Sequence, residues 1–425
     1  MRVLAVLLSL VVVGCGSHAA PAGSNGGNGG TNPGASVDAG GPGDSSDAGD
    51  NGGDNGGDNG GDAGDQGGLA TINPSTAPSA DVTVQLAEAG SAVAAGFYAA
   101  DDEDISPDSV SYYEAENLDV LINPPAIGHD PLAQASAPDG PEFYFGPALG
   151  VIVTRGLGSD LVNIAQIYQR SGLRILALQS SGIGSLSALA DKRLSVLDAG
   201  RDYDVLAAMK GVGLTKSDVH LDRAPFDPTL VAGGAVDAAE VTIADEYAQI
   251  LETDDPDTGA PYAPASLTLL DVTAGSTPTL QEGIYARASW LADPANVDIA
   301  VRFLRATFDG WVYCRDNFED CVRLVADSDG SEAPTQHQRW VLNESEALIW
   351  PSPAGIGTLS ASDWAADAQA ALDAGLIRNA VSADATRADL AQTAQQSMTG
   401  ADLIGANFEK GTVQITPGGI DPSSP

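Results

Sequence analysis

The sequence has few basic residues, few cysteines and no long hydrophobic run. Its 425 residues include 19 Lys and Arg against 58 Asp and Glu, which gives a formal net charge of −39. Nucleic acids and anionic membrane surfaces are bound through clustered Lys and Arg, so this charge argues against both as partners. Three cysteines are too few for a disulfide scaffold and lack the spacing of a four-ligand zinc site. A mean hydropathy of −0.03 excludes a polytopic membrane protein.

The sequence also lacks the motifs of common enzyme classes. It has no Gly-x-Ser-x-Gly elbow, no phosphate-binding P-loop and no His-Glu-x-x-His zinc motif. The four histidines, His18, His129, His220 and His337, show no metal-ligand spacing. An acidic stretch at 327–332 lacks the residue order of a calcium-binding EF-hand. We therefore expect no catalytic residue, no metal and no cofactor.

The N-terminal segment has the pattern of an export signal. Arg2 precedes an eleven-residue apolar run from Val3 to Val13, which is too short to span a bilayer. The run ends in Val12-Val13-Gly14-Cys15, which resembles a bacterial lipobox. This pattern predicts a signal peptide at 1–14 and a lipid-modified Cys15 that anchors the chain to a membrane. An ordinary signal peptide followed by a chance cysteine is the alternative.

Residues 15–77 are rich in Gly, Asp and Asn. The repeat Asn-Gly-Gly-Asp recurs from residue 51 to 62, and residues 16–70 contain eight Asp but no Lys, Arg or Glu. With almost nothing apolar to bury, this segment is expected to be a disordered tether. Calcium binding by Gly/Asp repeats is the weaker alternative, because the period here is four residues and not nine.

The rest of the chain alternates short apolar runs with helical patterns, which is typical of an α/β fold with largely parallel sheets. Strands or buried segments are predicted at 81–86, 118–122, 143–145, 149–154, 163–168, 174–179, 193–197, 219–221, 236–241, 266–272 and 283–287. Helices are predicted at 91–100, from Asp130-Pro131 onward, at 204–211 and, in the C-terminal third, from Asp293-Pro294 onward and at 317–326, 336–348, 362–374 and 388–398. In the long helix after Pro294, apolar residues recur every three or four positions, so one face is expected to pack on a core. Residues 396–425 are expected to form a loose tail.

An ordered series of short motifs resembles one family of transport proteins. The motifs are Ala95-Gly96-Phe97-Tyr98-Ala99-Ala100, Tyr112-Tyr113, 117–120, Phe145-Gly146, 165–169, Ser181-Gly182-Ile183, 189–192, 234–238, Glu246, 303–306, Gly310-Trp311, Trp364 and 375–377. Together they resemble the thiamine-precursor, nitrate and sulfonate branch of ABC-transporter substrate-binding proteins. Each motif alone is weak, and the order over some 300 residues carries the resemblance.

The resemblance implies a two-lobed, periplasmic-binding-protein-like fold of type II, with a ligand cleft between the lobes. Lobe 1 is then expected at 78–178 and 275–395, and lobe 2 at 179–274. The two crossings between the lobes are expected near 174–182 and 267–282. Independently of the family, ligands of open α/β sheets bind beyond the carboxyl ends of the strands, which also places a site in this cleft.

Seven residues are candidates for ligand binding. Phe97 and Tyr98 follow the first strand, and one of them is expected to stack on a planar ligand, with packing in the core as the alternative. Glu246 matches a carboxylate of thiamine-precursor binders and suits an aminopyrimidine or a cationic ring. The remaining candidates, each with a purely structural alternative, are Gln169, Ser181, Gly182 and Tyr285.

Cys314 and Cys321 are candidates for a disulfide bond. On one continuous helix they lie about 10 Å apart, too far for a disulfide. Asp316-Asn317 suggests a break between two helices, and an exported chain meets an oxidising compartment. We therefore expect a disulfide between these two cysteines.

The leading hypothesis is a monomeric, lipid-anchored solute-binding protein that delivers a small molecule to an ABC permease and catalyses no reaction. A planar heterocycle, such as a thiamine-precursor pyrimidine or a flavin-like ring, is the favoured ligand. A sulfonate or another small anion is the alternative ligand. A ligand sensor without a permease is an alternative role. An enzyme of thiamine-pyrimidine synthesis is the least favoured, because the four lysines include none placed in the cleft and the iron-binding cysteine motif is missing.

Overall fold

A computed structural model describes residues 75–421, apart from 89–90, 106–108, 127, 198–201, 224–225, 274–279 and 329–332.

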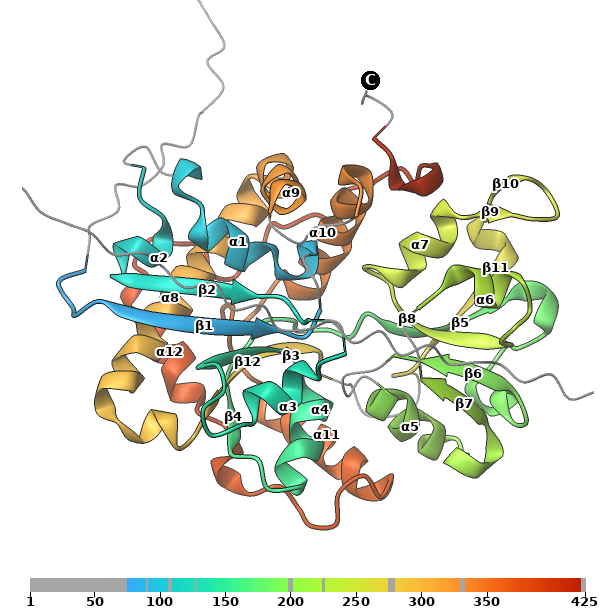
Figure 1. Cartoon of the computed structure of the whole chain (residues 1–425), viewed down its shortest axis with the longest axis horizontal. Coiled ribbons are helices and arrows are strands. Elements are labelled where there is room, and N and C mark those ends of the chain that lie inside the picture. The colour runs from blue at the N-terminus through green and yellow to red at the C-terminus, as the bar shows by residue number, and fades with distance from the viewer. Residues whose placement is uncertain are drawn as a thin grey trace, which may run out of the picture. The chain divides into compact units, whose positions relative to one another are not determined.

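The first of two five-stranded sheets forms the centre of lobe 1. The strand order of the first sheet is β2-β1-β3-β12-β4 (Figure 1). The strands are β1 (Ala80–Leu86), β2 (Leu118–Asn123), β3 (Phe143–Pro147), β4 (Leu161–Gln166) and β12 (Glu282–Arg287).

The second sheet forms the centre of lobe 2, with the order β11-β5-β8-β6-β7. Its strands are β5 (Leu173–Leu178), β6 (Arg193–Val196), β7 (His220–Arg223), β8 (Ala238–Thr242) and β11 (Leu267–Asp271). A separate hairpin pairs β9 (Asp254–Asp255) with β10 (Ala260–Pro261). Figure 1 shows the two five-stranded sheets in separate lobes, which are joined by connecting segments of the chain.

Both five-stranded sheets are mixed, where the sequence suggested largely parallel ones. Strands β1, β2 and β3 run parallel, as do β6, β7 and β8. Strand β12 is antiparallel to β3 and β4, and β5 is antiparallel to β8 and β11. The reversed strands adjoin the crossings. Strand β4 leads through the first crossing into β5, and β12 follows the second crossing.

The first crossing comes earlier than the sequence suggested. The predicted crossing at 174–182 is wrong, because Leu173–Leu178 already forms strand β5 inside the second sheet, between β11 and β8. The chain therefore changes lobes at 167–172. The second crossing falls between Asp271, which ends β11, and Glu282, which begins β12, within the predicted range. Lobe 2 thus begins at β5 and not at residue 179.

Twelve α-helices occur in the described part of the chain. They are α1 (Ala95–Asp101), α2 (Tyr112–Ala115), α3 (Pro131–Ala135), α4 (Ala148–Gly156), α5 (Asp202–Gly211), α6 (Pro228–Ala232), α7 (Glu246–Glu252), α8 (Pro294–Asp316), α9 (Phe318–Asp327), α10 (Thr335–Ile349), α11 (Ala361–Asp373) and α12 (Ala388–Ser397). The segment at 149–154, considered as a strand, lies in α4, so its continuous apolar run reflects a buried helix.

Helix α8 organises the main core of lobe 1. As the sequence predicts, Asp293 caps its start by accepting a hydrogen bond from the backbone N–H of Ala295. The inward face of α8 carries Phe303, Phe308 and Trp311, all fully buried. The ring of Phe303 stacks on Phe143 of β3 with ring centroids 4.0 Å apart, so the helix packs directly on the sheet.

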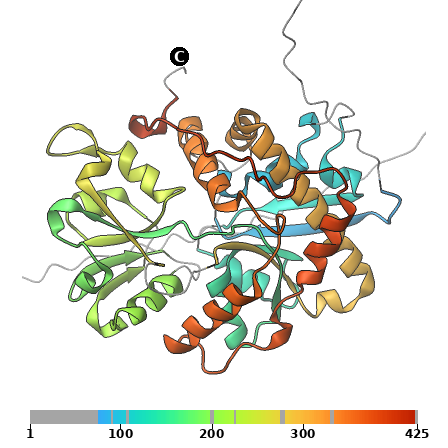
Figure 2. The ribbon, with the colours of Figure 1, turned by 180° about the vertical axis from the view of Figure 1, so that it is seen from behind.

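The C-terminal segment is not a loose tail where the structure describes it. After α12 the chain returns across lobe 1, and the backbone carbonyls of Leu403 and Ile404 accept hydrogen bonds from Ile356 and Ser352. A short 3₁₀ turn, η9 (Pro417–Gly419), then contacts α7 of lobe 2. The view from behind shows this segment running along the helices of lobe 1 toward lobe 2 (Figure 2). Leu403 and Phe408 pack against the main core of lobe 1, so apolar contacts add to these hydrogen bonds.

Candidate functional site

In lobe 1, several strand ends come together at one edge of the sheet. Strands β1, β2 and β3 are parallel, so their carboxyl ends share that edge. Strand β12 runs the other way and pairs Glu282 with Pro147, so the start of β12 lies at the same edge. The end of β4 joins them, because Gln166 pairs with Gly283. This edge therefore collects the residues that follow β1 and β4 and those that precede β12.

In lobe 2, the corresponding edge is formed by the ends of β6, β7 and β8. These three strands are parallel. Thr242 at the end of β8 pairs with Leu173 at the start of β5, which directly follows the first crossing. The carboxyl ends of the lobe 2 strands therefore lie on the side of the crossings, facing the edge of lobe 1.

Two small hollows occur where these edges meet. The first is lined by Ala87, Glu88, Ser91, Val93, Ala94, Phe145 and Glu282. The second is lined from both lobes, by Glu88, Val93, Tyr168, Gly172, Thr242, Ala244, Gln281, Glu282 and Leu348. Each has a volume of about 10 Å³, enough for about one water molecule. A larger ligand therefore requires the two edges to move apart and close again around it.

The second hollow is lined by two carboxylates, those of Glu88 and Glu282, and by the side-chain amide of Gln281. Glu88 and Glu282 line both hollows. Gln281 is 2% exposed, and its side-chain nitrogen has no hydrogen-bond partner among the described residues. A buried donor without an acceptor is costly, so a ligand acceptor placed there would gain a full hydrogen bond. Tyr168 forms the wall, and its hydroxyl donates to the carbonyl of Val93 at 3.0 Å.

Beside the second hollow, α10 of lobe 1 is fastened to α7 of lobe 2. The His337 ring on α10 lies 3.1 Å from Oδ1 of Asp245 and 3.0 Å from Oε2 of Glu252. Burial alone lowers the pKa of His337, but hydrogen bonds and charge from both carboxylates outweigh it and raise the pKa to about 10. The indole N–H of Trp340 donates to the carbonyl of Ile243 at 3.0 Å. These contacts join the lobes on one side of the cleft.

The sequence matches a family model described as NMT1/THI5 like over residues 93–320, more than half of the chain. The chain belongs to the NMT1/THI5-like family. The matched region begins at the first hollow, contains all of lobe 2 and ends in α9 of lobe 1. No curated protein sequence is similar enough to count as a relative.

Solved structures show the fold of this NMT1/THI5-like chain. The alkanesulfonate-binding protein SsuA from Xanthomonas axonopodis pv. citri bound to MOPS has a TM-score of 0.52 and 14% identity, over 74% of this chain and 100% of that one. The aliphatic sulphonate-binding protein SsuA from Escherichia coli has a TM-score of 0.50 and 15% identity, over 72% and 90%. A ligand-binding component of an ABC-type import system from Staphylococcus aureus has a TM-score of 0.52 and 11% identity, over 75% and 99%. The predicted two-lobed periplasmic-binding-protein fold is therefore confirmed.

Three aromatic candidates lie in the cores of lobe 1 and line neither hollow. Phe97 is fully buried on α1, with its ring 4.8 Å from that of Phe145. Tyr98 is half-buried against the same core. Tyr285 on β12 is fully buried opposite Tyr144, and burial raises its pKa well above the ordinary value. The rings of Phe97 and Tyr98 both pack on the core of lobe 1, which is the alternative to stacking on a ligand.

Gln169 and Glu246 lie near the crossings, and both are engaged within the chain. The Gln169 side chain donates to the carbonyl of Gln166 at 2.7 Å, which fastens the first crossing to lobe 1. Glu246 Oε2 accepts hydrogen bonds from the backbone N–H and the hydroxyl of Thr242, both at 2.7 Å. Glu246 thus shapes the turn that brings Thr242 to the second hollow, and its own carboxylate does not line that hollow.

Ser181 and Gly182 lie at the opposite end of lobe 2. They follow β5, which starts at the crossing and runs six residues away from it, about 20 Å. The Ser181 hydroxyl donates to the carbonyl of Leu178, and Gly182 has a φ of 71°, which favours glycine. The structure therefore does not bring these two residues to the cleft, because the crossing precedes β5.

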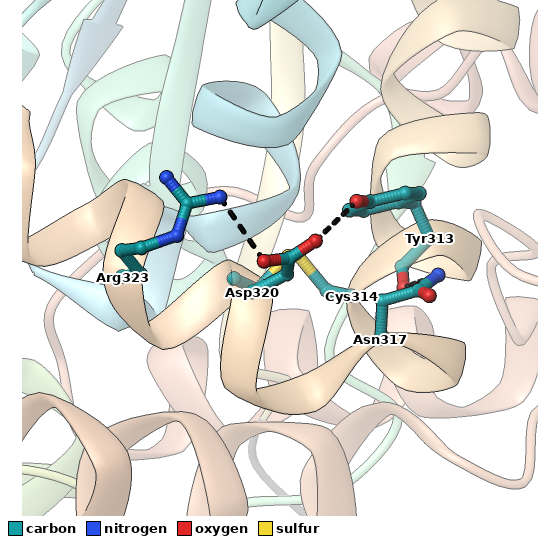
Figure 3. Close-up of a disulfide and its surroundings, with 6 residues drawn as sticks. Tyr313, Cys314, Asn317, Asp320 and Arg323 are labelled. Carbon is teal, nitrogen blue, oxygen red and sulfur yellow. Dashed lines mark hydrogen bonds and ion pairs between the residues drawn. A yellow bond between two sulfur atoms is a disulfide. The ribbon is translucent and has the colours of Figure 1, made fainter. Parts of the chain in front are cut away.

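A disulfide joins Cys314, in the last turn of α8, to Cys321 in α9, with Cα atoms 5.2 Å apart (Figure 3). The helix breaks at Asn317, whose backbone N–H still donates to the carbonyl of Tyr313. Asp320 lies beside the bond and accepts hydrogen bonds from the Tyr313 hydroxyl and from Arg323. Cys15, the candidate lipid attachment site, lies outside the described residues.

The residues of the hollows that sequence reasoning missed are Thr242, Gln281 and Glu282. Glu88, which follows β1, also lines both hollows. The sequence signal that could have identified Glu282 as a site residue is its position at the start of a predicted strand, next to a predicted crossing. In the described part of the chain, no cluster of three metal-ligating side chains occurs. No helix there has the length and apolar content to cross a membrane.

Proposed function

We propose that this protein is an extracytoplasmic solute-binding protein that captures a small molecule for an ABC importer. One observation carries the proposal. The strand ends of two separate sheets face each other across two crossings, and the hollow between them is lined by Glu88, Gln281 and Glu282 on one side and by Thr242 on the other. The resemblance of the fold to ligand-binding components of importers supports it.

The mechanism is a shift between open and closed arrangements of the lobes. A ligand that touches both edges contacts the whole site only in the closed form, so binding favours closure. The permease then recognises the closed protein. Each crossing is a single segment, and the contacts of α10 with α7 hold one side of the cleft, so the opening motion takes place on the other side.

We infer that the ligand is a planar nitrogen heterocycle with amino or cationic groups, as in a thiamine-precursor pyrimidine. Carboxylates bind amino and cationic nitrogens through strong, charge-assisted hydrogen bonds. Glu88 and Glu282 supply two carboxylates, and the Gln281 amide supplies a donor for a ring nitrogen or an oxygen. Such a ring presents donors and an acceptor on neighbouring atoms, which matches this combination.

A sulfonate is the second candidate ligand. It is favoured by the two sulfonate-binding proteins of similar fold and by the amide donor of Gln281, which has no acceptor among the described residues. The two glutamates oppose it, because a carboxylate beside a sulfonate repels it in a site of low dielectric.

The proposal also includes export, anchoring through Cys15, a monomeric state and delivery of the ligand to a permease. A sensor role without a permease remains the alternative use of the same site.

The first test identifies the ligand directly. The chain is purified from its own cells and denatured, and the released small molecules are identified by mass spectrometry. We expect an aminopyrimidine or a related heterocycle. Titration calorimetry then compares 4-amino-5-hydroxymethyl-2-methylpyrimidine with ethanesulfonate on the purified chain.

The second test changes the charge of the hollow. Glu282→Gln is expected to weaken pyrimidine binding about 10-fold or more, because a charge-assisted hydrogen bond becomes a neutral one. Glu319→Gln, at an exposed site on α9, is the matched control and is expected to leave that affinity unchanged. Tight ethanesulfonate binding that improves in Glu282→Gln would establish the sulfonate alternative instead.

A further inference from the structure

A second and much larger cavity lies away from the cleft, under the C-terminal segment. It has a volume of about 620 Å³, in the range of small-molecule sites. One wall is the junction of α8 with α9, the second is a stripe along α10, and the third is the chain at 402–414. We call it the C-terminal pocket. It shares no lining residue with either hollow of the cleft.

The two guanidinium groups of the C-terminal pocket are already occupied. Arg315 binds both carboxylate oxygens of Asp316, at 2.7 and 3.0 Å, donates to the carbonyl of Asp402 and lies over the ring of Trp350. Arg339 binds Glu319 with its Nη2 2.8 Å from Oε2. Both are therefore neutralised by protein carboxylates, and neither is available to a ligand anion.

Glu346 is the buried acid of this pocket, and among the described residues it forms no ion pair. Its side chain lines the pocket from α10 and is 3% exposed, and Oε1 has no hydrogen-bond partner among the described residues. Lys410 of the C-terminal segment pairs with Glu344 instead, on a different face of α10. A buried carboxyl that stays unpaired is costly, and a ligand that donates to it removes that cost.

The rest of the pocket suits a ligand with a flexible apolar chain. Phe318, Phe408 and Val413 provide apolar surface, and the amide of Asn343 lies one turn from Glu346 on the same stripe of α10. Acidic residues outnumber basic ones in the lining, which disfavours anions. Gly411 lets the segment approach closely, since a Cβ atom there would lie 2.9 Å from Oδ1 of Asn343.

We propose that the C-terminal pocket is a second ligand site, which binds an aliphatic diamine or polyamine through an ammonium group on the Glu346 carboxylate. The Asn343 side-chain oxygen accepts a second N–H, and the methylene chain lies against Phe318 and Phe408. An ammonium group has three donors and no acceptor, so it satisfies both oxygen acceptors at once.

Binding at this site is coupled to a proton. Burial, with a smaller contribution from Asp316 and against the effect of Arg315, raises the pKa of Glu346 to about 8. Near pH 7 the carboxyl is therefore mostly protonated, and an ammonium ion that binds displaces the proton. The affinity then rises with pH and levels off above about 8. The charged groups around the pocket are Arg315, Asp316, Glu319, Arg339, Asp402 and Glu409.

Titration calorimetry of the purified chain with 1,4-diaminobutane and with spermidine tests the proposal. We expect binding at pH 8.5, weaker binding at pH 6.5, and heats at pH 7 that differ between two buffers of different ionisation enthalpy, because a proton is released. 1,4-Butanediol, which has the same chain length but no charge, is expected not to bind. Glu346→Gln is expected to weaken diamine binding at least 10-fold.

Glu282→Gln in the cleft is the matched control and should leave diamine binding unchanged. Loss of diamine binding in Glu282→Gln would place the amine in the cleft and overturn the proposal, as would unchanged binding in Glu346→Gln or no binding to the unaltered chain. If thermal denaturation shows that Glu346→Gln is unfolded, the buffer comparison on the unaltered chain decides. Heats that do not depend on the buffer would then reject Glu346 as the site.

Discussion

At the scale of single residues, His337 joins the two lobes through a pair of carboxylates. It is 4% exposed on α10, and it bridges two carboxylates of lobe 2, Asp245 and Glu252. Replacing one member of such a buried charged group leaves the others unpaired. His337→Gln is expected to lower the free energy of unfolding by about 2 kcal/mol near pH 6, as for other hydrogen bonds to charged groups.

The pH dependence of this effect has a definite sign. The folded-state pKa of His337 is raised to about 10 from 6.5, so its ion pairs stabilise fully below pH 6.5 and progressively less up to pH 10. The difference in unfolding free energy between the original chain and His337→Gln should therefore shrink between pH 6.5 and 10. Urea denaturation at four pH values measures it. His220→Gln, at an exposed residue of β7, is the matched histidine control.

At the scale of elements, α1 and α8 pack closely against each other because each has a glycine at the contact. A Cβ atom at Gly96 would lie 2.3 Å from Cγ of the buried Trp311, and one at Gly310 would lie 2.0 Å from the carbonyl oxygen of Gly96. Gly96→Ala is expected to cost about 2 to 3 kcal/mol of stability through overpacking. Gly184→Ala, where no atom lies within 4 Å, is the matched control in a denaturant titration. Equal stability of the two variants would contradict the close crossing.

The junction of α8 with α9 depends on the disulfide between Cys314 and Cys321. A bridge over seven residues restricts the unfolded chain and is worth about 2.5 kcal/mol by loop-closure entropy. The double variant Cys314→Ala, Cys321→Ala is expected to lose about that amount. The original chain should lose a similar amount in the presence of dithiothreitol, while the double variant should not respond to it. A response of the double variant to dithiothreitol would exclude this disulfide as the cause.

Most elements followed from the sequence, but the lobe to which β5 belongs did not. The helix after Asp293-Pro294 could be predicted because its cap and its apolar spacing are local signals. The direction of β5 could not, since a buried strand has the same composition whichever sheet and whichever direction it joins. From the sequence, the crossing is predicted after β5 and not before it. Ser181 and Gly182 are therefore predicted at the cleft, although they lie at the far end of lobe 2. For the same reason the motif aromatics Phe97 and Tyr98 were candidates for the cleft, although packing on β3 and α8 holds them in the core.

At the scale of the whole molecule, the C-terminal segment ties the two lobes together in addition to α10. It leaves lobe 1 at 402–414, and its turn η9 then lies on α7 of lobe 2, where a Cβ atom at Gly419 would lie 3.1 Å from Oε2 of Glu252. Asp421 pairs with Arg339 of α10 at 3.3 Å. The segment therefore adds contacts that depend on the relative position of the lobes, and a change in that position alters both the cleft and this attachment.

Deleting the chain from residue 415 onward tests this attachment. The deletion removes η9 and Asp421 but leaves the wall of the C-terminal pocket at 402–414. We expect faster hydrogen exchange in α7, because its covering turn is lost, and weaker binding of the cleft ligand, because less free energy favours the closed form. Hydrogen-exchange mass spectrometry measures the first effect, with β1 and α1 of lobe 1 as internal controls that should not change. Unaltered exchange in α7 would show that the contacts of His337 and Trp340 hold the lobes together without the C-terminal segment.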